Sequence, residues 1–159
     1  MKTLLLTLLL ALAAPVLRAD VVRPAPEFSW VDSTGARKSS KSLLGRPVIL
    51  VIAESPREWA FRSQVGQLQK MYERLAADKA VCVAAFSREP GVVRSNIPFV
   101  TAADGPRTAY DLQVEHGFAI AVIGRDGNLD YTGNHVLPVQ RIYDILNNSF
   151  VVQKSLRRP

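Results

Sequence analysis

The sequence predicts a single α/β domain in which a mixed central β-sheet is flanked by helices on both faces. Three nearly continuous apolar runs, at 48–52, 80–86 and 118–123, are typical of strands buried on both faces of a sheet. The most regular helical pattern, from 56 to about 77, separates the first two runs and indicates a strand–helix–strand crossover. A turn sequence containing Asp-Gly follows the third run and predicts an antiparallel hairpin.

Before the first buried run, we expect an extended arm and one edge strand. Residues 21–25 are punctuated by prolines, and residues 27–31 alternate between apolar and polar side chains. Residues 32–35 have the composition of a turn, and the polar stretch 36–42 is expected to be a loop.

The helix expected from 56 to about 77 has a complete start signal. Ser55 is a favourable N-cap residue, Pro56 suits the first helical position, and Glu58 would complete a capping box. An apolar stripe follows at helical spacing, formed by Phe61, Val65, Leu68, Tyr72 and Leu75.

Weaker signals predict the elements after the second buried run. A loop is expected at 87–96, a short strand at 97–101 and one or two helical turns at 107–112. The hairpin should return along 129–133, and an amphipathic pattern indicates a last helix from 138 to about 147.

The first residues have the pattern of an export signal. Lys2 precedes a short apolar stretch at 4–12, which at about nine residues falls well below the roughly 20 that span a bilayer. We expect cleavage after Ala19, with Ala13 or Ala14 as other candidate positions and an uncleaved anchor as the alternative interpretation. The chain is therefore expected to be exported, to the periplasm or the extracellular space.

These features divide the chain into four expected parts. Residues 1–19 form the signal peptide, 20–42 the N-terminal arm with its edge strand, 43–150 the folded domain, and 151–159 a basic tail. The formal net charge of the whole chain is +6, but the positive residues are scattered and form no basic stripe interleaved with aromatic residues. Nucleic acid is therefore not an expected partner.

Cysteine usage limits the possible redox chemistry. The chain has one cysteine, Cys82, so it can form no internal disulfide. Because Cys82 lies inside the apolar run 80–86, we expect it to be a small buried core residue.

Four stretches, in chain order, carry a resemblance to a known branch of proteins. They are Pro-Glu-Phe-Ser-Trp-Val-Asp-Ser-Thr-Gly at 26–35, Leu-Gly-Arg-Pro-Val-Ile-Leu-Val at 44–51, residues 97–112, and Val-Ile-Gly-Arg-Asp-Gly at 122–127. Together they resemble the thioredoxin-fold branch that contains peroxiredoxins and membrane-anchored thiol reductases. The resemblance covers roughly 24–147 and implies a thioredoxin-like fold. The short exported format also resembles an uncharacterised family of secreted thioredoxin-like domains without active-site cysteines, which implies no activity.

The residues on which that branch's chemistry depends are missing. Glu-Ser-Pro-Arg-Glu-Trp stands at 54–59, where thioredoxins have a cysteine pair and peroxiredoxins a single cysteine preceded by Thr and Pro. The thioredoxin cis-proline would fall near Phe118, and no proline is there. Related copper chaperones need a cysteine pair and a later histidine, a site that His135 alone cannot make. We therefore expect no catalytic residues, no cofactor and no metal.

The start of the predicted helix is nevertheless a candidate binding surface. Trp59 lies about 200° around the helix from Phe61, away from the apolar stripe, and is flanked by arginines. Such a Trp can stack on an anionic or aromatic partner, or it can pack under the loop at 87–96 or the N-terminal arm. The candidate partner-binding residues are Glu54, Arg57, Trp59, Arg62, Phe118 and His135.

The sequence therefore favours an exported, non-catalytic thioredoxin-fold protein that acts as a binding or accessory module in the cell envelope. The resemblance implies that this edge receives an extended polypeptide, so the expected partner is an extended polypeptide or envelope protein. One alternative is a residual redox protein, peroxiredoxin-like or thiol-exchanging, that uses Cys82. Another is a structural envelope component whose basic tail contacts anionic polymer or lipid. A hydrolase based on Ser55 and acid–base chemistry by Glu54 and Glu58 are disfavoured, because capping and helix electrostatics explain those residues.

Overall fold

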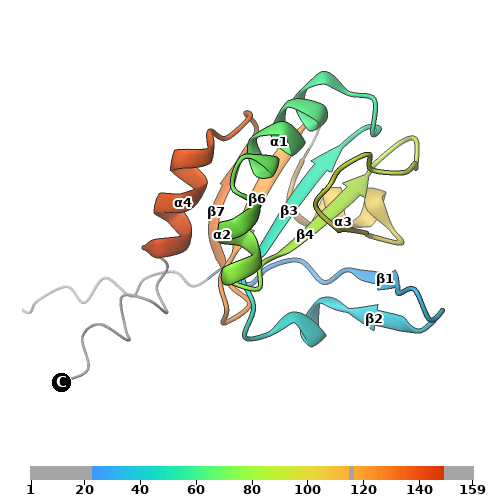
Figure 1. Cartoon of the computed structure of the whole chain (residues 1–159). Helices are drawn as coiled ribbons and strands as arrows, with labels where there is room; N and C mark the ends of the chain where they lie inside the picture. Colours follow the sequence, from blue (N-terminus) through green and yellow to red (C-terminus); the bar gives the residue numbers. More distant parts are fainter. Residues whose placement is uncertain (1–22, 115–116, 149–159) are drawn as a thin grey trace, which may run out of the picture.

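The computed structural model describes residues 23–114 and 117–148 (Figure 1). The expected signal peptide and the basic tail lie outside the described residues. In chain order the elements are β1 (Ser29–Val31), β2 (Arg37–Ser39), a 3-10 helix η1 (Ser40–Leu43), β3 (Val48–Ala53), α1 (Trp59–Gln69), α2 (Tyr72–Ala77), β4 (Val81–Phe86), β5 (Phe99–Thr101), α3 (Gly105–Asp111), β6 (Ala119–Ile123), β7 (Leu129–Gly133) and α4 (Val139–Asn147).

The main sheet has five strands in the order β5-β4-β3-β6-β7. Strands β3, β4 and β5 run parallel, whereas β6 is antiparallel to β3 and β7 is antiparallel to β6. Every residue of β3 and of β4 is buried, as expected for strands covered on both faces. The predicted mixed sheet is confirmed.

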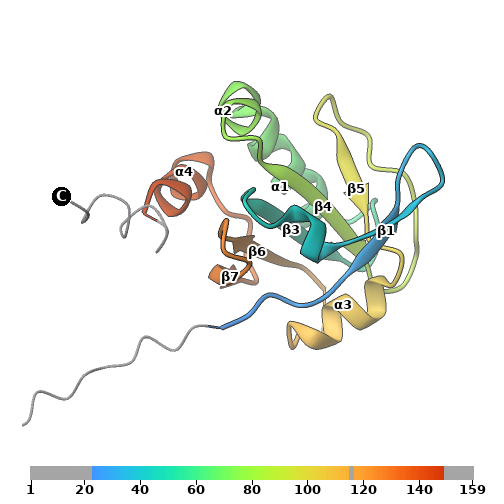
Figure 2. The same cartoon turned by 90° about the horizontal axis from the view of Figure 1, so that it is seen from below.

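Two apolar cores lie on opposite faces of this sheet. On one face, α1, α2 and α4 pack against side chains such as Ile49 of β3 and Ile120 of β6. On the other face, Phe28, Trp30 and η1 cover the alternate residues of the same strands, together with α3 (Figures 1 and 2). Helices therefore flank both faces, as predicted.

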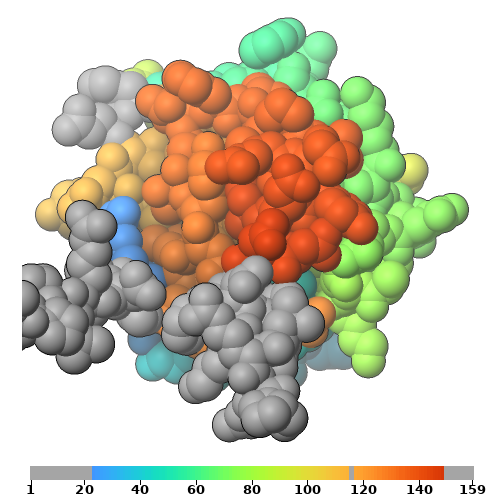
Figure 3. Space-filling view, turned by 90° about the vertical axis from the view of Figure 1, so that its left-hand side faces the viewer, coloured from blue at the N-terminus to red at the C-terminus, as the bar shows by residue number. Residues whose placement is uncertain are grey.

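Helix α4 is joined to its neighbour α2 by a polar contact at the edge of the first core. Arg74 of α2 donates from Nη2 to Oδ1 of Asn147 at 2.6 Å and from Nη1 to the Tyr143 hydroxyl at 3.3 Å. Figure 3, which faces this side of the molecule, shows α4 lying between α2 and the β7 segment. Asp78 accepts a hydrogen bond from the same guanidinium, which raises the pKa of Arg74.

The predicted start of the long helix is wrong by three residues. Helix α1 begins at Trp59, and Glu58, not Ser55, occupies the N-cap position. Ser55 Oγ instead accepts a hydrogen bond from the N–H of Arg57 at 3.3 Å, and Glu58 Oε2 accepts one from the N–H of Glu54 at 2.9 Å. The residues of the expected capping box thus form a tight turn that precedes the helix.

The expected 56–77 helix is also interrupted near its middle. The N–H groups of Lys70 and Met71 bond to carbonyls three residues earlier, and Met71 has φ −114° and ψ 23°. This break changes which side chains face the core, because Met71 is buried whereas Tyr72 is 47% exposed. The placement of Tyr72 on the apolar stripe is therefore wrong.

The polar stretch 36–42 is not a simple loop. Arg37 pairs with Val31 in the β1–β2 hairpin, and η1 follows at once. Asp32 organises the hairpin turn, because its carboxylate accepts hydrogen bonds from the N–H and hydroxyl of Thr34 and from the N–H of Ala36. These bonds lower the pKa of Asp32, the Thr34 hydroxyl contributing most. All three β2 residues are exposed, so no apolar alternation marks the strand.

The other strands and helices expected within the described residues are present, with small shifts of their bounds. The hairpin between β6 and β7 turns at Gly127, whose φ of +82° suits the Asp-Gly sequence. Helix α3 starts at Gly105 because Oδ1 of Asp104 accepts the Arg107 N–H at 3.0 Å, a standard N-cap bond. Among the described residues, no helix has the length and apolar composition needed to cross a membrane.

Candidate functional site

The candidate site lies where β3 ends and the chain turns into α1. Backbone hydrogen bonds hold the loop that follows β4 against this turn. The N–H of Ser87 bonds to the carbonyl of Ala53 at 2.9 Å, and the N–H groups of Arg88 and Glu89 bond to the carbonyl of Glu54 at 3.1 and 2.9 Å. The carboxyl ends of these two parallel strands therefore present one continuous edge formed by the turn at 54–58 and the loop at 87–96.

Two ion pairs cross between the turn and the loop. Arg88 Nε lies 3.4 Å from Glu54 Oε1, and Arg57 Nη1 lies 3.8 Å from Glu89 Oε1. The side chains of both ion pairs are accessible to solvent, so the pairs contribute little to the stability of the fold. Their carboxylates offset only part of the positive charge at this edge.

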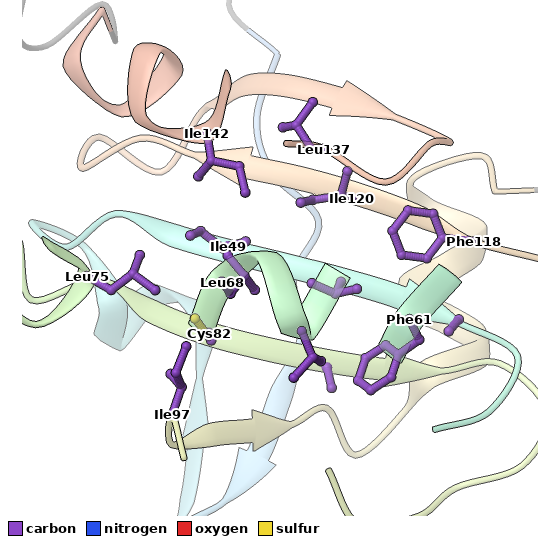
Figure 4. Packing of buried hydrophobic residues seen from close by; sticks show 14 of the residues in the cluster. Ile49, Phe61, Leu68, Leu75, Cys82, Ile97, Phe118, Ile120, Leu137 and Ile142 are labelled. Carbon is purple, nitrogen blue, oxygen red and sulfur yellow. The ribbon is translucent and has the colours of Figure 1, made fainter. Parts of the chain in front are cut away.

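The single thiol of the chain is not part of this exposed edge, because it is buried in the core. Cys82 is the second residue of the fully buried strand β4, in register with Ile49 of β3 and Phe99 of β5. Its side chain is 2% exposed, and Figure 4 shows its sulfur among Ile49, Leu68, Leu75 and Ile97. Burial raises the pKa of Cys82 to about 12, so the thiolate is scarce at neutral pH. Cys82 is the buried core residue that the sequence predicts.

Three of the predicted binding residues are exposed together at the start of α1. Trp59 is 73% exposed, and Arg57 and Arg62 are exposed as well. Trp59 and Arg62 are three residues apart on α1 and so lie on neighbouring positions of one helix face. The alternative in which Trp59 packs under the loop or the N-terminal arm is therefore wrong.

The other three predicted residues lie in different environments. Phe118 is buried in the core near Ile120 and Leu137, so its side chain offers no surface to a partner (Figure 4). His135 is exposed in the connection between β7 and α4. Glu54 faces a separate hollow of about 680 Å³ on the α3 side, where Tyr110 also lies. The structure therefore does not gather all six residues into one site.

The structure adds one charged residue that the sequence did not single out. Arg94, in the loop after β4, lines a groove of about 650 Å³ together with Arg57 and Arg62. More than thirty positions separate Arg57 from Arg94 in the chain, so no local motif could reveal that they share a groove. Within residues 23–114 and 117–148, no cluster of three or more His, Cys, Asp or Glu side chains could hold a metal ion.

Comparison with known proteins defines the fold. No protein-family model and no curated protein matches the sequence. A solved structure of a thiol:disulfide interchange protein from Bacteroides sp. matches with a TM-score of 0.61 at 13% identity, covering 86% of this chain and 94% of that one. The chain has a thioredoxin-like fold.

Two further solved structures agree. The peroxidoxin BcpB from Mycobacterium tuberculosis has a TM-score of 0.58 at 16% identity and covers 86% of this chain and 97% of its own. The pneumococcal exposed lipoprotein thioredoxin Etrx1 has a TM-score of 0.58 at 14% identity, with coverages of 75% and 96%. The expected resemblance to thioredoxin-fold thiol-disulfide oxidoreductases and peroxiredoxins is thus confirmed at the level of fold, in a chain whose one cysteine cannot form a Cys-x-x-Cys pair.

Proposed function

We propose that this chain is an exported thioredoxin-fold protein that has lost thiol chemistry and acts by binding, as an accessory module in the cell envelope. The observation that carries the proposal is the environment of Cys82, whose burial and raised pKa oppose attack on any disulfide or peroxide. The β3–α1 turn, where thiol enzymes of this fold place their nucleophile, holds Glu-Ser-Pro-Arg-Glu instead.

The exposed start of α1 supports a binding role. A Trp with 73% of its surface exposed is unusual without a partner, since aromatic and Arg residues are enriched where proteins bind one another. Arg57 and Arg62 flank this Trp in the sequence, and both also line a groove together with residues of the loop at 87–96. We infer that the partner is an extended polypeptide or envelope protein, which rests on analogy with the way active relatives of this fold use the same edge.

Export is part of the proposal and rests on the N-terminal sequence. The positive residue, short apolar stretch and small residues at the predicted cut are the features of a signal peptide. One structural neighbour is an exposed lipoprotein thioredoxin, which fits this expectation.

A residual redox function of Cys82 is the competing hypothesis. It would require the β4 strand to open, because the sulfur lies under α1 and α2. Rapid modification of the native thiol would favour this hypothesis over ours.

Partner capture tests the binding role. The signal-free protein is immobilised, exposed to envelope extract of the source organism, and compared with the double variant W59A/R62A and with R141A, which removes an exposed Arg on α4. We expect a specific protein to be retained by the wild type and by R141A and lost from the double variant. Equal retention by all three proteins would contradict the assignment of this surface.

A further inference from the structure

We propose that the groove between α1 and the loop at 87–96 binds an acidic peptide segment that carries an apolar side chain. This inference rests on the proposed binding function and names the class of its partner. The groove has a volume of about 650 Å³, and it lies on the α1 side of the loop, apart from the hollow that Glu54 faces.

The charge of the groove selects the partner. Arg57, Arg62 and Arg94 line it, whereas Glu89 is the one carboxylate in its lining and is only 3.8 Å from Arg57. In the part of the chain that the structure describes, no carboxylate lies within 4.0 Å of the guanidinium of Arg62 or Arg94, which leaves both cations available. Uncompensated arginines in a concave site attract carboxylates and can bind them in a bidentate manner.

The groove also has apolar side chains in its lining, which favour a ligand with an apolar side chain as well as negative charge. Phe61 and Val65 of α1 border the groove but are only 2% and 5% exposed, so they offer a ligand little surface. The accessible apolar lining comes from Pro56 and from Pro90 and Val92 of the loop. Val92 lies in the lining with 83% of its surface exposed, an apolar side chain that a partner could cover. A segment with acidic residues and at least one apolar side chain would satisfy both kinds of lining.

Both ends of the groove are fixed by contacts within the chain. Gly91 approaches Pro56 so closely that a Cβ at this position would lie 2.6 Å from Pro56 Cγ. At the other end, Gln69 Nε2 donates to Ser95 Oγ at 3.3 Å, and Ser95 Oγ also accepts the N–H of Ile97 at 3.0 Å. A groove held in this way loses little conformational entropy when a ligand binds.

A peptide fits these observations better than a membrane surface. The arginines line a hollow that also contains a carboxylate, Glu89, and the apolar side chains of Pro90 and Val92. Adsorption to anionic lipid instead needs basic residues on an open face. The groove is lined on one side by α1 and on the other by the loop at 87–96, so a peptide could lie between the two.

The test uses the signal-free protein and fluorescence anisotropy. The probe is a short labelled peptide of alternating Glu and Leu, and its counterpart alternates Lys and Leu. We expect the acidic peptide to bind and the basic one not to bind, with binding weakened by added salt. Charge reversal in R94E should weaken binding about tenfold or more, because it replaces attraction by repulsion. R94K should bind more tightly than R94E and less tightly than the wild type, because Lys keeps the charge but not the bidentate geometry. The matched reversal R141E on α4 should leave the affinity unchanged.

Three results would overturn the inference: equal binding of the two peptides, an R94E affinity equal to that of R141E, or binding only to vesicles that contain anionic phosphatidylglycerol. Arg94 is exposed and R94E should fold, which far-UV circular dichroism and a thermal melt verify; R62E supplies a second reversal in the same groove. The result also separates the two proposals. If R94E changes nothing while W59A/R62A still abolishes partner capture, the groove assignment fails and the binding function stands.

Discussion

Gln64 is a single residue on which the packing of α1 depends. Its side chain is fully buried on α1, where its Nε2 donates to the carbonyl of Leu137 at 3.2 Å and its Oε1 accepts the N–H of Leu137 at 2.7 Å. These two bonds join α1 to the segment that leads into α4. Gln64 lies three residues after Phe61 and four before Leu68, which places it on the core-facing side of α1.

Replacing Gln64 with Leu should lower the free energy of unfolding by about 1–3 kcal/mol, because a buried N–H and a buried C=O lose their partner. The exposed change Q140L on α4 is the control and should alter stability by less than about 0.5 kcal/mol. Urea denaturation of both variants measures the difference. Equal midpoints would show that water or a rearranged loop satisfies Leu137.

The buried thiol predicts a pH effect with a definite sign. The pKa of Cys82 is raised from 9.0 to about 12, so the native state keeps its proton where the unfolded state loses it. This contribution to stability is therefore fully present below pH 9 and declines as the pH rises toward 12, by up to about 1.4 kcal/mol per pH unit. Between neutral pH and about pH 10.5, the free energy of unfolding measured by urea titration should fall less in C82A than in the wild type, because the variant has no thiol to titrate. Parallel pH profiles would contradict the burial of this thiol.

At the scale of elements, the sequence identified the strands better than the helix boundaries. The runs that became β3, β4 and β6 were predicted because burial on both faces demands continuous apolar side chains. The start of α1 was misplaced because Ser55, Pro56 and Glu58 can serve a turn as well as a cap, and only the contact with Glu54 decides between them. The division at Met71 depends on tertiary packing that no periodicity records.

Two glycines in helices provide a matched test of element packing. Gly105 starts α3 directly against the end of β4, and a Cβ there would overlap the backbone of Phe86. G105A should therefore destabilise the protein by about 1–3 kcal/mol, since backbone cannot move aside easily. Gly66 lies within α1, where an added Cβ would meet nothing within 4 Å apart from its chain neighbours and the helix's own backbone, so G66A should stabilise by about 0.5–1 kcal/mol. Thermal melts that shift in the same direction for both variants would contradict this expectation.

At the scale of the whole molecule, the chain has a thioredoxin-like fold and a single cysteine, which cannot form a Cys-x-x-Cys pair. The fold was predictable because four weak motifs occur in the correct order, each placed on a strand or turn that the structure contains. The candidate site was only partly predictable. Helical phase placed Trp59 away from the apolar stripe but did not decide whether it packs under the loop or the N-terminal arm. Burial of Phe118 and the position of Arg94 beside α1 depend on how the sheet brings distant segments together.

The proposed loss of thiol chemistry can be tested by alkylation of Cys82 in the folded, signal-free protein. Iodoacetamide labelling is followed by intact mass over time and pH, with a denatured sample as the reference. We expect slow labelling of the native protein that reaches completion only in denaturant, because the sulfur is buried in the core. Fast native labelling, with a midpoint well below the value of about 8.5 for a free cysteine, would contradict the proposal and identify Cys82 as a reactive thiol.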